Sequence, residues 1–349
     1  MRHKKIYVLA PETRHPSGGI KQLFRLVDGL NSLGYEAALI QRSRAKRITW
    51  FANETKIVYF PYLYFLLRQI VIKGRNTKKW SYKLSNFLFF SKKLPSKDSI
   101  IVLPEIYGHR IVNIIPENRY VIFNQNCFLT YNLFPYNQTV EDPYKNRNIL
   151  ACMTVSENSK AYLQFVYPDL PIHRMRLGLG EMFRFSGKKQ QQIAFMPRKL
   201  SEDSNQIINI LKTRDKIRGW HFVPIDNKSE DEVAHILKES ALFLSFNYQE
   251  GLGLPPLEAM ACGCYVIGYA GQAGVEYFKE EFSSLVVDRD IIAFAKEIER
   301  IAAIYDANPD VIQSKGKAAS EYVRAVYNMA NEKQDVKNIW DSIMENALD

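Results

Sequence analysis

Two glutamates separated by seven residues stand out in the stretch NYQEGLGLPPLEAMACGCYVIG, residues 247–268. No histidine or third acid lies beside Glu250 and Glu258 to complete a metal site or a hydrolytic pair. The residues between them are glycine, proline and leucine, so the backbone is expected to contribute as much as the side chains. Carboxylates beside free backbone N–H groups suit a ligand that combines hydroxyl groups with an anion.

The elements around this stretch predict how the glutamates are positioned. ALFLSF (241–246) is a continuous apolar run, typical of a strand that is buried on both faces. Glycines in the following loop permit backbone torsions that other residues resist, and two prolines suit the first turn of a helix over 255–262. The sequence therefore predicts a strand, a glycine loop that carries the first glutamate, and a short helix whose first turn carries the second.

This arrangement predicts the class of ligand. In parallel α/β folds, ligands bind beyond the carboxyl ends of the strands, where helix N-termini present free N–H groups that favour a diphosphate. The two glutamates can accept hydrogen bonds from hydroxyl-bearing groups on either side of it. A nucleotide sugar supplies all three parts, because its diphosphate joins a ribose to a hexose.

The stretch from Glu250 to Glu258 resembles the E-x7-E signature of retaining glycosyltransferases of the GT-B fold, family 4 (the glycogen-synthase-like and sucrose-synthase-like group). The resemblance implies that Glu258 binds the ribose of the donor and that Glu250 lies against the donor sugar. It also implies that a run of backbone lines the sugar and the diphosphate. That run is Gly251, Leu252, Gly253 and Leu254.

The motif FMPRK ends the predicted first strand of the second half. By the same resemblance, Arg198 and Lys199 clamp the departing diphosphate, since a planar fork and a point charge both offset developing negative charge. The family carries a further lysine that would fall near Asp203 or Ser204, so Lys199 is expected to substitute for it. With Glu250, these two cations are the expected catalytic residues.

Further contacts follow from the resemblance. Gly18 and Gly19 open the first helix and are expected to approach the phosphates, while Glu276 is expected to shape the base and ribose pocket. FNQNCF stands where many relatives carry a histidine, and its amides bond to hydroxyl groups but do not exchange protons near neutral pH. The expected contacts to sugar or acceptor are Asn124, Gln125, Asn126 and His109, the last as a stand-in for that histidine.

Short apolar runs alternate with amphipathic stretches in both halves, which indicates βα units and parallel sheets. The predicted fold class is α/β, with two Rossmann-like doubly wound domains facing a central cleft and a C-terminal crossover helix, as in GT-B. In the second half, helices are predicted at about 205–218, 230–239, 255–262 and 271–279. The expected divisions are an acceptor domain over 1–184, a linker over 185–192, a nucleotide-sugar domain over 193–325 and a C-terminal helix over 326–349 that packs back toward the first domain.

The net charge of +10 is unevenly distributed along the chain. Residues 1–150 hold 24 Lys or Arg against 9 Asp or Glu, whereas the remainder holds 23 against 28. Residues 56–97 contain ten Lys or Arg, ten aromatic residues and no acid. Such a surface can make peripheral contact with an anionic membrane, or it can be a solvated face over an apolar core. No recognition motif accompanies it, so no nucleic acid partner is expected.

The expected location is cytoplasmic, with peripheral contact at the inner face of the membrane. The apolar part of the N-terminus is too short for a signal peptide, and no uncharged run reaches the ~18–20 residues of a membrane span. Four cysteines in 349 residues do not make a disulfide framework, and they are expected to be reduced.

The predicted reaction moves a hexose from a nucleoside-diphosphate sugar to a glycan, lipid-linked or small-molecule acceptor, with retention. No cofactor or metal is expected, because cationic side chains and helix amides replace a metal and no DxD motif accompanies the donor site. Two alternatives stay open, namely a non-catalytic nucleotide-sugar-binding protein and a sugar-nucleotide epimerase of the same fold. The sugar, base, acceptor, linkage and oligomeric state are not determined by the sequence.

Overall fold

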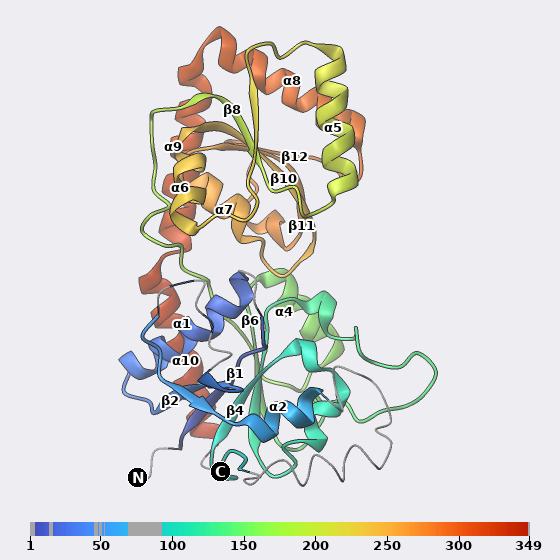
Figure 1. Ribbon diagram of the computed structural model, residues 1–349, viewed down its shortest axis with the longest axis vertical. Helices are drawn as coiled ribbons and strands as arrows, with labels where there is room; N and C mark the ends of the chain where they lie inside the picture. Colours follow the sequence, from blue (N-terminus) through green and yellow to red (C-terminus); the bar gives the residue numbers. More distant parts are fainter. Residues whose placement is uncertain are drawn as a thin grey trace. The chain divides into compact units, whose positions relative to one another are not determined.

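The computed structural model describes residues 4–13, 17–44, 48, 51, 53–68 and 93–347. The chain divides into two compact units (Figure 1). The first unit comprises Met1–Val155, Ser159–Met175 and Lys333–Asp349, and the second comprises Ser156–Asn158 and Arg176–Glu332. Each unit is built around one parallel sheet with helices, so the predicted α/β fold class is confirmed.

The described residues of the first unit form a sheet of seven parallel strands. In spatial order they are β3 (Ile57–Tyr59), β2 (Ala37–Gln41), β1 (Ile6–Leu9), β4 (Ile100–Pro104), β5 (Arg119–Asn124), β6 (Ile149–Thr154) and β7 (Ile172–Arg174). The order reverses between β1 and β4, which makes this the topological switch point of a doubly wound sheet. Both strands are buried almost completely, as their apolar runs require.

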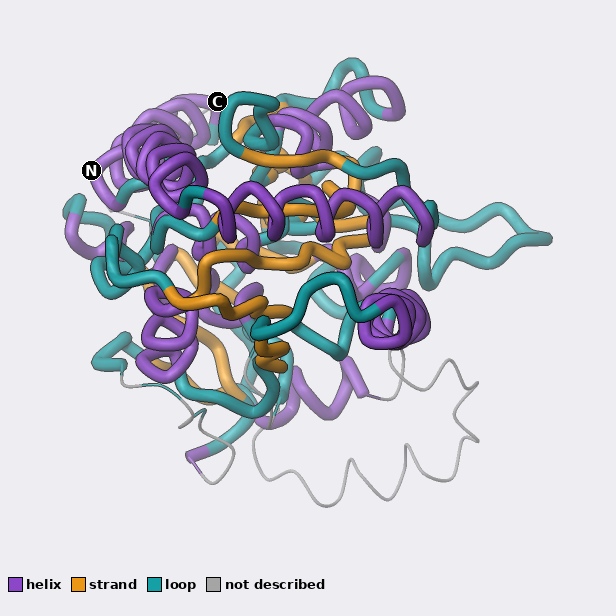
Figure 2. The backbone as a smooth tube through the Cα atoms, turned by 90° about the horizontal axis from the view of Figure 1, so that it is seen from above, coloured by secondary structure: helices purple, strands orange, loops and turns teal. Residues whose placement is uncertain are grey.

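The described residues of the first unit also form helices and a long loop. The helices are α1 (Gly18–Ser32), α2 (Pro61–Leu67), α4 (Glu157–Val166), the short 3-10 helices η3 (Glu105–Tyr107), η4 (His109–Asn113) and η5 (Cys127–Leu129), and most of α10 (Met329–Asn346). The loop between β5 and β6 reaches out from the body of this unit, as the teal segment at the right of Figure 2 shows.

The chain returns to the first unit in α10. Trp340 of this helix is fully buried, and the Tyr35 hydroxyl donates a hydrogen bond of 2.7 Å to Asp341 Oδ1. At the end of the chain, Lys4 Nζ donates to the carbonyl oxygen of Ala347 at 2.6 Å. These contacts explain why a helix so far along the sequence belongs to the N-terminal sheet, as the predicted crossover helix requires.

The second unit contains a sheet of five parallel strands. In spatial order they are β12 (Ser283–Leu285), β11 (Tyr265–Gln272), β10 (Ser240–Glu250), β8 (Gln190–Phe195) and β9 (His221–Pro224). The helices are α5 (Ser201–Arg214), α6 (Glu230–Glu239), α7 (Leu254–Ala261), the 3-10 helix η6 (Ala273–Glu276), α8 (Ile291–Ala307) and α9 (Pro309–Val326). The strand order reverses between β8 and β10, so the switch point of this sheet lies between their carboxyl ends.

Two predicted elements of the second unit differ in the structure. The strand predicted over 241–246 continues as β10 to Glu250, which pairs with Gln272 after a shift of register. The helix predicted over 271–279 is wrong, because β11 runs to Gln272 and only the short η6 follows. Gly271 and Gln272 both have positive φ angles, of 62° and 69°, which do not fit a right-handed helix.

The limits between the units also differ from the expected ones. Residues 176–184 lie in the second unit instead of the first. There the backbone N–H of Gly178 donates to the Glu332 carboxylate at 2.6 Å, and Arg324 Nη1 donates to the carbonyl oxygen of Phe183 at 2.7 Å. At the other side of the expected linker 185–192, its last three residues already belong to β8.

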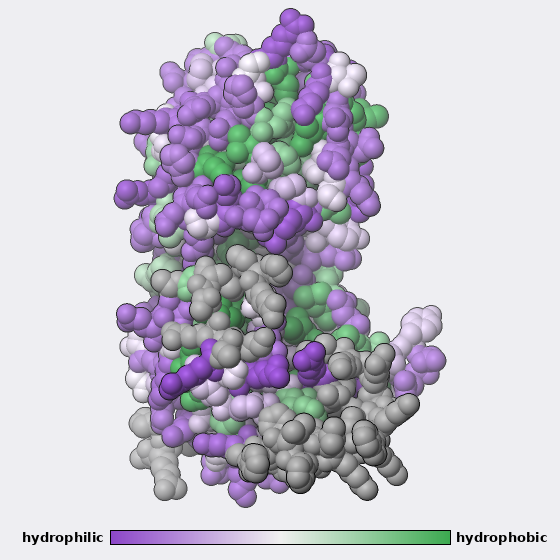
Figure 3. Space-filling model, viewed as in Figure 1, coloured by the Kyte–Doolittle hydropathy of each residue, from purple (hydrophilic) through white to green (hydrophobic). Residues whose placement is uncertain are grey.

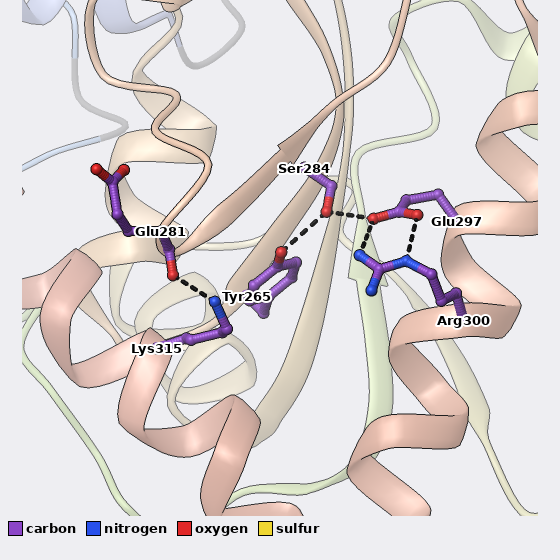
Figure 4. A network of polar contacts seen from close by, with 6 residues as sticks. All are labelled: Tyr265, Glu281, Ser284, Glu297, Arg300 and Lys315. Atoms are coloured by element: carbon purple, nitrogen blue, oxygen red, sulfur yellow. Dashed lines mark hydrogen bonds and ion pairs between the residues drawn. The ribbon is translucent and has the colours of Figure 1, made fainter.

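A polar network ties strands of the second unit to its outer helices (Figure 4). Tyr265 of β11 shares a hydrogen bond of 2.9 Å with Ser284 of β12, whose hydroxyl donates to Glu297 of α8 at 2.5 Å. Arg300 donates two further bonds to the same carboxylate. Since every polar group here has a partner within the unit, the network is structural.

Within the part of the chain that the structure describes, no helix is both long and apolar enough to cross a bilayer. The face seen in Figure 3 is mostly hydrophilic, with smaller apolar areas. The basic, aromatic surface predicted over 56–97 falls largely on 69–92, outside the described residues.

Candidate active site

The switch point of the second sheet brings two predicted motifs together. Arg198 and Lys199 follow β8, and Glu250 is the last residue of β10, the strand beside it. The helix α7 begins four residues after that glutamate. Ligands of open parallel sheets bind at this place, because the chain leaves adjacent strands in opposite directions and opens a crevice between the loops.

Lys199 and Glu250 form an ion pair at this point. The Nζ atom of Lys199 donates a short hydrogen bond to Oε1 of Glu250. The lysine side chain is 38% exposed and the glutamate side chain 22%, so both are accessible from the sheet edge. The pair places a carboxylate next to an ammonium group that has further N–H donors to offer.

Arg198 has a different partner. Its Nε atom lies 3.5 Å from Oδ1 of Asp226, which follows β9, and its side chain is 67% exposed. The two cations of the FMPRK motif are therefore held by separate carboxylates on either side of β8. The pairing of Arg198 with Asp226 was not predicted, although the place of Asp226 directly after the strand-like WHFVPI could have indicated it.

The glycine loop before α7 is closely packed. Gly253 has a φ of 84° and is the N-cap residue of α7, and a Cβ there would collide with Asn247 and Tyr277. The buried Tyr277 hydroxyl contacts the carbonyl oxygens of Leu252 at 3.0 Å and Gly253 at 2.9 Å. Burial raises the pKa of Tyr277 well above its usual value, so the hydroxyl keeps its proton as a donor. Only glycine fits here, and Tyr277 is a supporting residue that the sequence analysis did not find.

The start of α7 can receive an anion. Its N-cap glycine supplies no side-chain acceptor, and a proline lies at one of its first two positions. The remaining first amides of a helix have no partner within the helix and favour negative charge. Glu258 is half-buried in this helix, but it is the fifth residue, so it lies in the second turn and not in the first as predicted.

Glu276 has other partners than a ribose. Its Oε1 accepts a hydrogen bond of 2.6 Å from the Tyr327 hydroxyl, and its Oε2 accepts one of 3.0 Å from the backbone N–H of Glu157. Both contacts lie within the second unit, to which residues 156–158 belong. The predicted role of Glu276 in shaping the base and ribose pocket stays a prediction, and the two oxygens of its carboxylate contact groups of the second unit itself.

Asp203 stands where the resemblance places a lysine. This side chain is only 6% exposed and accepts a hydrogen bond of 2.6 Å from Arg289 Nη1, an interaction that also raises the pKa of the arginine. The guanidinium carbon of Arg289 lies 5.6 Å from the ring centre of Tyr248, near the end of β10. A cation therefore does reach this position, but from 86 residues further along the chain, which sequence spacing does not reveal.

In the first unit, the structure joins two of the predicted regions. The side-chain Nε2 of Gln125 donates to the carbonyl oxygen of Gly19 at 3.0 Å. A Cβ at Gly19 would lie 3.2 Å from Oε1 of the same side chain, so the glycine permits close packing. Gly18 is exposed at the start of α1, and Asn126 caps η5 by accepting from the backbone N–H of Phe128 at 3.1 Å.

Asn124 and His109 do not take the roles expected of them. Asn124 is fully buried, and its Nδ2 donates to Thr130 Oγ1 at 2.9 Å and to the Tyr144 hydroxyl at 2.8 Å, so it faces the core and not a sugar. His109 Nδ1 lies 2.9 Å from the carbonyl oxygen of Leu133, and its Nε2 lies 3.3 Å from Arg110 Nε. Since both ring nitrogens have partners, His109 is not a free substitute for the missing histidine.

A carboxylate that the sequence analysis missed lies at the switch point of the first sheet. Glu105 directly follows β4 and is 8% exposed. Burial raises the pKa of its carboxyl to about 7, against the effect of hydrogen bonds from its own backbone amide and those of Gln125 and Asn126. Its Oε2 has no hydrogen-bond partner in the described part of the chain. The only sequence signal is its position after the apolar run IIVLP.

Comparisons with known proteins agree with this geometry. Residues 204–317 match the sequence model of the family described as glycosyl transferases group 1. An α-1,6-glucosyltransferase of Actinobacillus pleuropneumoniae serotype 7 (strain AP76) is 27% identical over 237 residues, which are 66% of this chain and 70% of the relative. The matched family segment contains the helix α7 and both glutamates of the E-x7-E motif.

Solved structures share the fold over nearly the whole chain. Sucrose-phosphate synthase from Thermosynechococcus elongatus aligns with a TM-score of 0.65 at 13% identity, covering 98% of this chain and 99% of that one. HepE of Anabaena, solved in complex with UDP-glucose, aligns with a TM-score of 0.61 at 11% identity, covering 97% and 100%. The chain has the two parallel α/β sheets of the GT-B fold, and its glycosyl transferases group 1 segment carries the E-x7-E motif at the second switch point, so we identify it as a glycosyltransferase.

Proposed function

We propose that this enzyme transfers a hexose from a UDP-sugar to a glycan or lipid-linked carbohydrate acceptor, without a metal ion. The observation that carries the proposal is the Lys199–Glu250 pair at the second switch point, beside the uncapped start of α7. The choice of UDP follows HepE, which was solved with UDP-glucose, and the choice of a hexose follows the α-1,6-glucosyltransferase relative.

The diphosphate is proposed to lie at the N-terminus of α7, with Lys199 and Arg198 on its other side. Departure of the nucleotide places new negative charge on this group, and cations with oriented amides stabilise such charge most strongly. Glu250 accepts hydrogen bonds from hydroxyl groups of the donor sugar, while its pairing with Lys199 fixes its position. Glu258, further along α7, is proposed to bind the ribose.

The Lys199–Glu250 pair also predicts how the lysine behaves when the donor binds. Lys199 contacts Glu250 in the free enzyme and the diphosphate in the complex, so its side chain moves little between the two states. A catalytic group that is already held near its place loses less conformational entropy on binding. Lys199 is therefore proposed to assist departure of the diphosphate more than binding of the sugar.

The test measures transfer and hydrolysis of UDP-glucose, UDP-galactose and UDP-N-acetylglucosamine by wild type and variants. We expect Glu250→Ala and Lys199→Ala to lower kcat/KM by about 100-fold or more, as removal of one charge-stabilising group does elsewhere. Arg218→Ala is the control, because this arginine is 82% exposed and pairs only with Asp215 in the same unit. Equal activity of Glu250→Ala and Arg218→Ala would contradict the proposal.

Two further readouts separate the finer parts of the proposal. Activity that survives excess EDTA supports a mechanism without metal, and loss that Mg²⁺ or Mn²⁺ restores contradicts it. An epimerase would convert the donor sugar in the absence of any acceptor. Product analysis of the UDP-sugar pool therefore distinguishes that reaction from transfer.

A further inference from the structure

A hollow of about 720 Å³ opens within the loop between β5 and β6. Every residue that lines it falls between Tyr131 and Arg147, so the hollow belongs to the first unit alone. This loop is the segment that reaches out in Figure 2. The volume is within the ~300–1,000 Å³ of pockets that bury small ligands. Lys199 and Glu250 at the second switch point do not line this hollow.

A chain of contacts holds the loop in this shape. The Asp142 carboxylate accepts from the Tyr167 hydroxyl at 3.0 Å and from the backbone N–H of Tyr144 at 2.9 Å. The Tyr167 hydroxyl in turn lies 2.7 Å from the hydroxyl of Tyr131, and the rings of Tyr144 and Tyr167 stack with centroids 4.7 Å apart. Because Tyr144 and Tyr167 are core residues of the first unit, the hollow is formed before any ligand arrives.

The lining combines aromatic faces with groups that bond to hydroxyls. Tyr131 is 38% exposed, and its ring meets Phe134 edge to face with centroids 5.1 Å apart. Gln138 and Thr139 supply an amide and a hydroxyl at the exposed part of the loop. Sugar rings need both, because their C–H faces pack on aromatic rings while their hydroxyls need donors and acceptors.

The acidic and the basic residues that line the hollow differ in their contacts. Glu141 accepts a hydrogen bond from Asn146 Nδ2 at 2.5 Å, and Asp142 is engaged as described. Lys145 and Arg147 are exposed, and the described part of the chain records no ion pair for either. The acids thus serve the loop itself, whereas the cations are available to an anionic group of a ligand.

We infer that this hollow binds an oligosaccharide segment of the acceptor that carries carboxylate or phosphate groups. Its rings lie against Tyr131 and Phe134, and its anionic groups meet Lys145 and Arg147. The inference rests on the proposed function only in assigning the oligosaccharide to the acceptor, since the hollow is complete within the first unit.

The test uses hexagalacturonate as an acidic probe and maltohexaose as a neutral one, with titration calorimetry on the full chain. We expect the acidic probe to bind more tightly, and Tyr131→Ala and Arg147→Ala each to weaken it about tenfold. Tyr131→Phe keeps the aromatic ring, so this variant should bind the acidic probe as tightly as wild type. Tyr136→Ala is the control, because this residue is fully exposed in the same loop and does not line the hollow.

Three results would overturn the inference. They are no binding of either probe, unchanged binding in both Tyr131→Ala and Arg147→Ala, and an equal loss in Tyr136→Ala. Binding of maltohexaose as tightly as the acidic probe would overturn the assigned charge. Hydrolysis of the UDP-sugar without acceptor should remain unchanged in all these variants, so failure at the hollow is distinguishable from failure of the proposed donor site.

Discussion

The switch points of the two sheets both carry a glutamate at the carboxyl end of a central strand, but in opposite surroundings. In the second unit, Glu250 is accessible and paired with Lys199. In the first, Glu105 is buried, and burial raises its pKa to about 7. The same topology therefore leaves a charged group accessible in one sheet and retains a carboxyl inside the protein in the other. Sheet topology determines where a site lies, and the burial of its side chains determines which chemistry they can perform.

The loops beside the two glutamates differ in the same way. In the second unit, backbone torsion and a buried tyrosine shape the loop, and Glu250 before it remains accessible. In the first unit, Asn124 donates to Thr130 and Tyr144 of the loop that follows it, Asn126 caps η5, and Gln125 donates to Gly19 of α1. Changes to the second loop should therefore abolish function, whereas changes to the first should alter stability.

The largest effect is expected from Gly253→Ala. The new Cβ collides with Asn247 and Tyr277, and alanine is strained at a φ of 84°. We expect a loss of about 4 kcal/mol in the free energy of unfolding of the second unit. Binding of UDP-sugar should also be lost, as measured by calorimetry.

Gly34→Ala is the matched control for this change. Gly34 has a φ of 90°, but nothing lies within 4 Å of an added Cβ. It should show the backbone strain alone, about 1 kcal/mol, and bind UDP-sugar normally. Similar losses in both variants would mean that packing of the loop before α7 is unimportant.

The next effect concerns the pH dependence that Glu105 confers. Its pKa rises from an ordinary 4.5 to about 7 in the folded state. Below pH 4.5 the carboxyl is protonated in both the folded and the unfolded chain, so it costs no stability there. Between these values the unfolded chain ionises first, and stability falls by about 3 kcal/mol by the time the pH exceeds the folded pKa. Glu105→Gln should remove this decline, measured by urea denaturation at pH 5 and pH 8.

Glu117→Gln serves as the comparison for the pH experiment, since Glu117 is exposed in the same unit. It should leave the decline between pH 5 and pH 8 as in wild type. If Glu105→Gln declines as steeply as Glu117→Gln, the carboxyl of Glu105 is not the group that is held protonated.

A smaller effect is expected from Tyr277→Phe. The change leaves two carbonyl oxygens of the glycine loop without their buried donor, at a cost of about 2 kcal/mol. The affinity for UDP-sugar should fall about tenfold, because the loop no longer has a fixed shape. Tyr265→Phe removes a hydroxyl of the structural network in Figure 4 and should lower stability without changing that affinity.

The smallest effect is expected from His109→Gln. Both ring nitrogens contact protein groups, so the imidazole has no free position from which to exchange a proton. We expect kcat/KM to change by less than about twofold between pH 6 and pH 8. A loss as large as that of Glu250→Ala would show that His109 does replace the missing histidine.

Much of the fold could be predicted because apolar runs repeat at the period of strands and helices. The alternation in both halves indicated two parallel sheets, and the E-x7-E motif indicated the loop at which we propose that the donor binds. The helix predicted over 271–279 failed, since the positive φ angles of Gly271 and Gln272 leave no trace in hydrophobic periodicity. Glu105 was overlooked because a single acid after an apolar run carries no pattern.

The sequence by itself determined the fold class and the presence of Glu250 and Lys199 at the ends of strands, because strand periodicity and loop composition are local properties. Only the tertiary structure decided that β8 and β10 are neighbours, so that these two side chains form a pair. It also decided that Arg289 reaches Asp203 and that Asn124 faces the core. The physical reason is that pairing and burial depend on which elements pack together, and residues far apart in the chain carry no local signal of it.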